Sequence, residues 1–130
     1  MAYAEGVSLD WNCGELAEGL GCYRTAEFFA AHEHWESVWL TLEEPEKSFL
    51  QALIQVTAAF HHLQAGNSAG AVSLLRRALR RLEAGPAEFG GIDVASLCAE
   101  IRLRLPAIER GTPFDAAAFA RVCPAVMDHS

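Results

Sequence analysis

Apolar residues recur at helical spacing along most of the chain, at about 3.6 residues per turn, and predict about five helices. The predicted segments are a short opening helix over residues 10–20 and longer helices over 25–42, 45–64, 68–82 and 94–108, and residues 115–122 can add a short sixth helix. No stretch shows the alternation of β-branched and polar residues that a strand requires. The pattern therefore predicts an all-α protein.

Turn and capping residues separate these segments. Gly19 and Gly21 should end the opening helix, and Thr25 can cap the next one, while Pro45 suits the first turn of the third. Gly66 and Asn67 are typical of a left-handed turn between two helices. A long loop is expected over residues 85–91. In the helix after this loop, 94–108, Pro106 predicts a kink.

Short links between successive helices favour antiparallel neighbours. A chain of 130 residues falls in the size range of one domain and can bury a single core. We therefore expect one domain over residues 1–130, folded as a compact bundle of antiparallel helical hairpins, with further helices over 92–122. The hairpin at residues 66 and 67 should lie at its centre.

Two polar residues of the segment 25–42 fall on its apolar side. The apolar arc of this helix is made by Phe28, Ala31, Trp35, Val38, Trp39 and Leu42. At 100° per residue, His32 lies about 40° from Phe28 and Glu36 about 80°, both inside that arc. Glu33 borders the arc, and His34 lies on the solvent side.

The segment 45–64 is apolar nearly all round and should be central. Its narrow polar face carries Gln51, Gln55 and His62, whose spacing keeps them on one side of the helix. A buried carboxylate costs several kcal/mol unless it is paired, so Glu36 needs a partner, which His32 one turn back or the polar row of this neighbouring helix can supply. The sequence thus predicts a polar cluster between the two helices, made of His32, Glu33, Glu36, Gln51, Gln55 and His62.

Two interpretations of this cluster stay open. It can be a structural hydrogen-bond network that fixes the packing of the helices. Alternatively, residues 32–36 read H-E-x-x-E, which places an imidazole and a carboxylate one turn apart, and His62 would complete an open site for a divalent metal with His32 and Glu36 as the other ligands. The catalytic candidates are then His32, Glu33 and Glu36, and the binding residues are Gln51, Gln55, His62 and Trp35.

The rival function is a helical-hairpin module that binds a protein partner or forms a homo-oligomer. It predicts an exposed apolar patch, which we place around Trp11, Phe89 or Phe114. The arginines from Arg76 to Arg81 are typical of a solvated helix surface, and could also hold an anion or an acidic partner. No substrate or reaction follows from these patterns.

Charge narrows the range of partners. The net charge is −7, and residues 1–65 carry ten acids against two bases. Such a chain should repel nucleic acid and anionic membranes, so neither is expected as a partner. Polar residues interrupt the uncharged stretch 48–75, which therefore should not span a membrane. The four scattered cysteines and the absence of a secretory signal at the start predict reduced thiols and a cytoplasmic protein.

Four ordered segments resemble a family of small helical proteins called domain of unknown function 309. They are A-H-E-H-W-E-S-V-W at 31–39, F-L-Q-A-L-I-Q at 49–55, H-L at 62–63 and G-N-S-A-G-A at 66–71, within a matching core of about 24–84. The resemblance implies an all-helical fold and makes the same six polar residues the family's signature, without an established reaction. The chain departs from the family pattern at Ala52, where glycine is expected, and before Tyr23.

Overall fold

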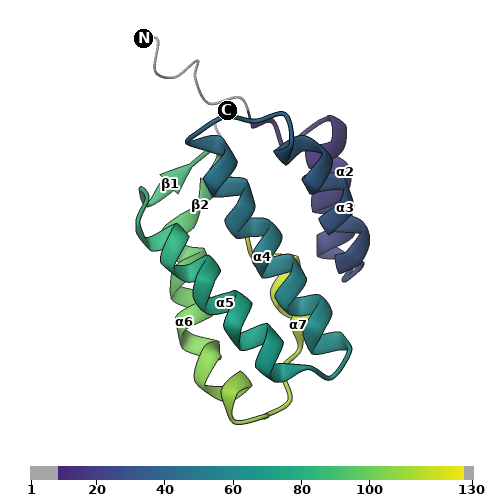
Figure 1. Ribbon diagram of the computed structural model, residues 1–130, viewed down its shortest axis with the longest axis vertical. Coiled ribbons are helices and arrows are strands. Elements are labelled where there is room, and N and C mark those ends of the chain that lie inside the picture. The colour runs from purple at the N-terminus through teal and green to yellow at the C-terminus, as the bar shows by residue number, and fades with distance from the viewer. Residues whose placement is uncertain (1–8, 128–130) are drawn as a thin grey trace.

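A computed structural model of the chain describes residues 9–127. Within this range it contains six helices and one small β-hairpin (Figure 1). The helices are α2 (Gly14–Arg24), α3 (Phe28–Trp39), α4 (Glu46–Gln64), α5 (Ser68–Glu83), α6 (Val94–Glu109) and α7 (Ala116–Val122), and the strands are β1 (Glu88–Phe89) and β2 (Ile92–Asp93). The predicted all-α class is confirmed.

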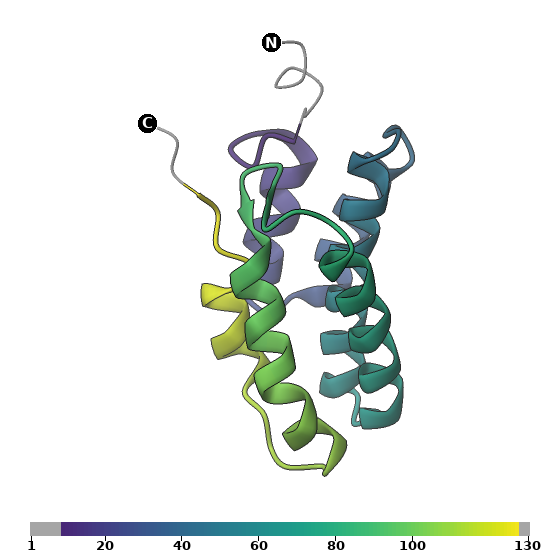
Figure 2. The same cartoon turned by 90° about the vertical axis from the view of Figure 1, so that its left-hand side faces the viewer.

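Each helix packs against the next one along the chain, from α2 to α6, and α7 returns to pack against α2 (Figures 1 and 2). Figure 2 shows α6 and α7 on the side of the molecule opposite α4 and α5. The central helix α4 is buried along most of its length, as its continuous apolar pattern predicts. Within the described range, no helix is long and apolar enough to cross a membrane.

Aromatic rings from four helices meet around Phe60 of α4. Its ring centroid lies 5.4 Å from that of Phe28, 6.2 Å from Tyr23 and 5.2 Å from Phe119 of α7. Trp35 of α3 stacks on Tyr23 at 5.6 Å and is fully buried. These contacts join α2, α3, α4 and α7 into one core, since aromatic pairs add to the free energy gained by burial alone.

The opening helix continues through the two glycines that were expected to end it. Both Gly19 and Gly21 lie inside α2. A Cβ atom on Gly19 would lie 2.3 Å from Nε1 of Trp35, whose indole N–H donates to the carbonyl oxygen of Leu16 at 3.2 Å. Gly19 is therefore needed for the close approach of α3 and not for a turn.

Thr25 ends α2 instead of beginning α3, so its predicted role as an N-cap was wrong. Its backbone N–H donates to the carbonyls of Gly21 and Cys22, and its hydroxyl also donates to Gly21 at 3.1 Å. Ala26 then takes a positive φ of 66°, and α3 begins only at Phe28. The hydroxyl thus satisfies the carbonyl end of one helix rather than the amide end of the next.

The segment 85–91, expected to be a loop, contains strand β1 and the turn of a β-hairpin whose second strand, β2, follows directly, which is a correction to the prediction of no strands. Gly90 and Gly91 form its turn with φ values of 57° and 85°, a conformation that favours glycine. The indole N–H of Trp11 donates to the carbonyl of Gly90 at 2.7 Å, and Met127 donates to that of Gly91. Two-residue strands are too short to produce an alternating pattern in the sequence.

The predicted turn between α4 and α5 is confirmed. Gly66 has a φ of 81°, and the side chain of Asn67 caps α5 by accepting from the backbone N–H of Gly70. The helix α6 continues through Pro106 to Glu109. All four cysteines, which lie in the described range, are free thiols.

Substitution of Gly19 by alanine should destabilise the protein by about 1–3 kcal/mol, because the methyl group overlaps the buried indole of Trp35. The matched control is Gly21→Ala in the same helix, where an added Cβ meets no atom within 4 Å. That change should stabilise the protein by about 0.5–1 kcal/mol. Urea denaturation measures both. Equal effects at the two positions would show that Trp35 does not restrict Gly19.

Burial raises the pKa of the Tyr23 phenol well above its ordinary value of 10.0, and the neighbouring Cys123 thiol raises it further. Above pH 10 the unfolded chain loses the phenolic proton while the folded chain keeps it, so stability falls as pH rises. Tyr23→Phe should make this fall less steep between pH 10 and 11 in urea titrations, and the part that remains comes from thiols such as Cys98 and Cys123, whose pKa burial also raises. At pH 7 the substitution should lower the free energy of unfolding only slightly, because within residues 9–127 the Tyr23 hydroxyl has no hydrogen-bond partner. An unchanged alkaline slope would contradict the assignment.

Candidate functional site

Helices α3 and α4 form an antiparallel pair whose alignment is set by contacts at both ends. The Gln64 amide donates to the carbonyl of Ala26 at 3.0 Å, and Phe28 meets Phe60. At the other end, the Lys47 ammonium lies 4.3 Å from the ring centroid of Trp39. The sequence-predicted polar residues of α3 and α4 therefore run along the same helix pair.

The histidines gather at one end of this pair. His32 and His62 line the same small hollow, of about 140 Å³, together with His61 and the exposed ring of Phe29. His32 is half-buried, and its Nδ1 is buried without a hydrogen-bond partner in the part of the chain described. The Nδ1 atom of His62 lies 3.0 Å from the Asn67 amide nitrogen, which can donate to it.

Glu33 and Glu36 are exposed, so the expectation that Glu36 is buried and needs a partner was wrong. Both lie on the outer stripe of α3 with Phe29 and Leu40, at spacings of four, seven and eleven residues. The buried side of α3 consists of Phe28, Ala31 and Trp35. This arc is narrower than the apolar pattern indicates, because α3 packs mainly between α2 and α4.

The proposed metal ligands are not gathered in this arrangement. Among residues 9–127, no three His, Cys, Asp or Glu side chains are placed to hold one metal ion. His32 and His62 share the hollow, whereas Glu36 is exposed on the outer stripe. A site made by His32, Glu36 and His62 would require side-chain rearrangement.

The two glutamines of α4 that were predicted to belong to the cluster, Gln51 and Gln55, are half-buried. Oε1 of Gln55 is buried and has no hydrogen-bond partner within the described range, and the same holds for Nε1 of Trp39 on α3. Trp35, predicted to bind a ligand, is instead a fully buried core residue. Trp39 and His61 were not selected from the sequence, because both fit an ordinary helical pattern and only the packing shows that they border the polar residues.

We call this surface the α3–α4 face. It consists of Phe29, His32, Glu33, Glu36, Trp39 and Leu40 from α3 and its end, and of Lys47, Gln51, Gln55, Ala58, His61 and His62 from α4. The acidic residues belong to α3, whereas the lysine, the glutamines and two of the imidazoles belong to α4. The two helices thus present different chemistry on one surface.

Large apolar side chains are exposed at different positions from those predicted. Trp11 is buried, with 6% exposure, and Phe89 and Phe114 are half-buried. The strongly exposed residues are Phe29 (56%), Leu40 (68%), Leu103 (70%) and Val122 (65%). Phe29 and Leu40 lie on the α3–α4 face, so apolar contact area is exposed on this surface and not at the three predicted aromatic residues.

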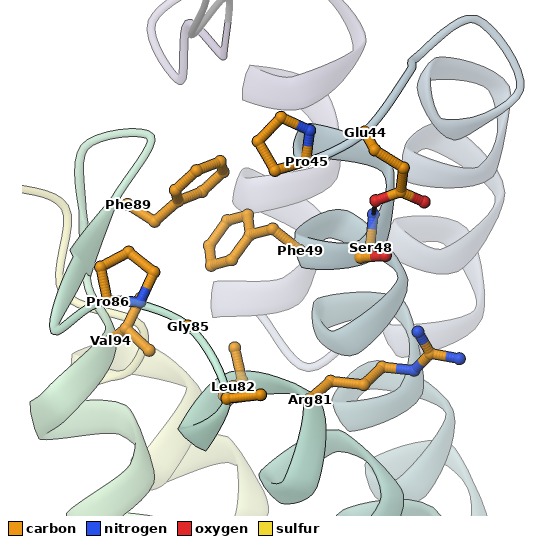
Figure 3. Close-up of a pocket in the computed structure, with 11 residues that line it drawn as sticks. Glu44, Pro45, Ser48, Phe49, Arg81, Leu82, Gly85, Pro86, Phe89 and Val94 are labelled. Carbon is orange, nitrogen blue, oxygen red and sulfur yellow. Dashed lines mark hydrogen bonds between the residues drawn. The ribbon is translucent and has the colours of Figure 1, made fainter.

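A larger pocket, of about 310 Å³, lies between the start of α4, the end of α5 and strand β1 (Figure 3). Its walls include Phe49, Leu82, Phe89 and Val94, and Arg81 lines it as well. Sequence analysis missed it, because its residues come from four separate segments. The clustering of Gly85 and Pro86 next to an arginine-rich helix was its one local signal.

Replacement of Gln55 by methionine should raise the free energy of unfolding by up to about 1 kcal/mol, since it removes a buried acceptor without a partner. Gln51→Met is the matched control on the same stripe, and it should give no such gain because Gln51 leaves no buried atom unpaired. Urea denaturation of both variants checks this. A loss of more than 1 kcal/mol on Gln55→Met would show that the amide is paired.

Comparison with other proteins supports the resemblance drawn from the sequence. Residues 16–74 match the family described as "Domain of unknown function (DUF309)". A protein of Aquifex aeolicus (strain VF5), named "Uncharacterized protein", is 30% identical over 99 residues, which cover 75% of this chain. The chain spans about 30% of that relative's length. In its segment 16–74, from α2 into α5, the chain is similar to the DUF309 family.

Proposed function

We propose that this chain is a helical interaction module that associates through the α3–α4 face. The observation that carries the proposal is the outer stripe of α3, where two large apolar side chains, Phe29 and Leu40, stand 56% and 68% exposed on either side of two carboxylates. Exposed apolar groups bordered by polar ones are typical of protein-binding surfaces.

The ring of Phe29 is held in place before any partner binds. Its centroid lies 6.3 Å from the His32 ring, to which it is nearly parallel, and 5.7 Å from the His61 ring. An anchor that is already ordered loses little conformational entropy on binding. The adjoining hollow of about 140 Å³ gives space for an apolar side chain of the partner.

The unpaired atoms of the face also favour association. His32 Nδ1, Trp39 Nε1 and Gln55 Oε1 are buried without partners among the described residues. Each such group costs about 1–3 kcal/mol. Small rotations of these half-buried side chains toward a second protein would recover part of that cost.

A second copy of the chain is the partner that the charges of the face favour. If α3 of one copy lies on α4 of the other about a two-fold axis, Glu33 and Glu36 face Lys47, the glutamines and the imidazoles, and not each other's carboxylates. Opposite charges then meet on both halves of the interface. The proposal is therefore a symmetric homodimer of modest affinity.

Sedimentation velocity at increasing protein concentration tests the proposal. We expect dimers at micromolar concentration for the wild type, and Leu40→Asp should weaken association at least tenfold, since it buries a charge in the interface. The matched control is Leu103→Asp on α6, which changes an equally exposed leucine (70%) outside the face and should leave association unchanged.

Two results would contradict the proposal. One is a wild type that stays monomeric at several hundred micromolar. The other is equal weakening by both substitutions.

A metal-binding or hydrolytic centre at His32, Glu36 and His62 is the competing hypothesis. It requires the exposed Glu36 carboxylate to turn toward the hollow that both histidines line. Elemental analysis of protein purified without chelator separates the two hypotheses. A stoichiometric metal that is lost in His32→Ala, together with a monomeric protein, would replace the dimer proposal by the metal centre.

A further inference from the structure

The pocket at the start of α4 combines an apolar wall with a charged rim. Pro45, Phe49, Leu82, Pro86, Phe89 and Val94 form the apolar part. Glu44, Ser48 and Arg81 contribute the polar groups, and Figure 3 shows them together on one side of the pocket, with the two phenyl rings and Pro86 on the other. The rings of Phe49 and Phe89 lie 4.9 Å apart, which fixes the back of the pocket.

The size of the pocket suits a small organic molecule. Its volume of about 310 Å³ is at the lower end of ligand sites, which usually span about 300–1,000 Å³. Phe49, Leu82 and Val94 are buried, so these walls are part of the folded core and are already in place. A branched aliphatic or phenyl group would fill the apolar part.

The two charged side chains of the rim, Arg81 and Glu44, form no ion pair with any described residue. Three other arginines of α5 and α6 form ion pairs, Arg76 with Glu109, Arg102 with Glu83 and Arg104 with Glu100, whereas Arg77 and Arg80 form none among the described residues and, unlike Arg81, do not line the pocket. In the described range Arg81 forms no ion pair, and neither does Glu44, although both line the same pocket.

One oxygen of Glu44 accepts from the backbone N–H of Ser48 at 3.2 Å. This bond fixes the carboxylate at the rim and leaves its other oxygen free. The rim therefore presents one cation and one anion, both available to a ligand.

We propose that this pocket binds a free α-amino acid with an apolar side chain. The side chain lies against Phe49, Leu82 and Phe89, the carboxylate meets the Arg81 guanidinium and the ammonium meets Glu44. A ligand that carries only an anion would face the unpaired Glu44 carboxylate, and one that carries only a cation would face Arg81. An internal peptide segment lacks both charges, and a chain terminus lacks one of them. Only a zwitterion pairs both groups of the rim at once.

Isothermal titration with three ligands that share a phenethyl group and differ in their charged groups tests the proposal. L-Phenylalanine should bind with a dissociation constant below about 1 mM, as expected for a ligand of this size. Phenylpropanoate lacks the ammonium group and phenethylamine lacks the carboxylate, and each should bind at least tenfold more weakly. The full chain is used, at pH 7 and 0.15 M salt.

Two substitutions on the exposed rim separate the two charges. Arg81→Gln should weaken L-phenylalanine at least tenfold and leave phenethylamine unchanged or tighter. Glu44→Gln keeps an oxygen that can accept from Ser48, and it should weaken L-phenylalanine while phenylpropanoate binds equally well or better. The matched controls are Arg77→Gln and Glu43→Gln, exposed neighbours that do not line the pocket and should have no effect.

Amide chemical shifts locate the bound ligand. Shifts confined to residues such as Ser48, Phe89 and Val94 would support the proposal. No binding up to 10 mM, an affinity for phenylpropanoate equal to that for L-phenylalanine, or shifts centred on the α3–α4 face would each overturn it. Association through the α3–α4 face is measured separately, so failure at one site leaves the other unaffected.

Discussion

Helix α3 can reach the core only because α2 has no side chain where the indole of Trp35 lies. A Cβ atom on Gly19 would be 2.3 Å from that ring, and no rotation of a fully buried tryptophan removes such an overlap. Next to Trp35, the ring of Tyr23 stacks on the indole and also contacts Phe28 and Phe60. The orientation of α3, and with it the surface that α3 shares with α4, follows from this one contact.

Most of the helical architecture could be predicted because it depends on local periodicity. The apolar pattern placed α4 and α5 within a residue or two of their observed limits, and Asn67 was correctly assigned to the turn between them. The errors occurred where the role of a residue depends on a contact with a residue far away in the sequence. Gly19 resembles a helix breaker until the indole above it is known, and the Gly90–Gly91 turn depends on Trp11, which lies about 80 residues away along the chain and donates to it.

The candidate surface was predicted in composition but not in burial. A helical wheel gives the direction of each side chain around the helix axis. It does not tell how much of the helix surface the neighbouring helices cover. The inferred arc for α3 included Glu36, whereas packing against α2 and α4 covers only the narrower side that holds Trp35. The sequence therefore predicted a buried carboxylate for Glu36, which is exposed to solvent in the structure. It also predicted a binding role for Trp35, which is fully buried in the core. The residues of the pocket near Phe49 come from several separate segments, so the one local signal, Gly85 and Pro86 beside the arginines of α5, was not enough to predict it.

The packing of α7 against α2 shows that the folded core extends beyond the segment that matches the family. The family match stops at residue 74, in the middle of α5, yet Phe60 is covered by Phe114 and Phe119 from beyond that limit. A fragment cut at the edge of the matched segment would leave this ring against solvent and would divide a helix. The structural unit of this chain is therefore larger than the segment 16–74 that matches the family.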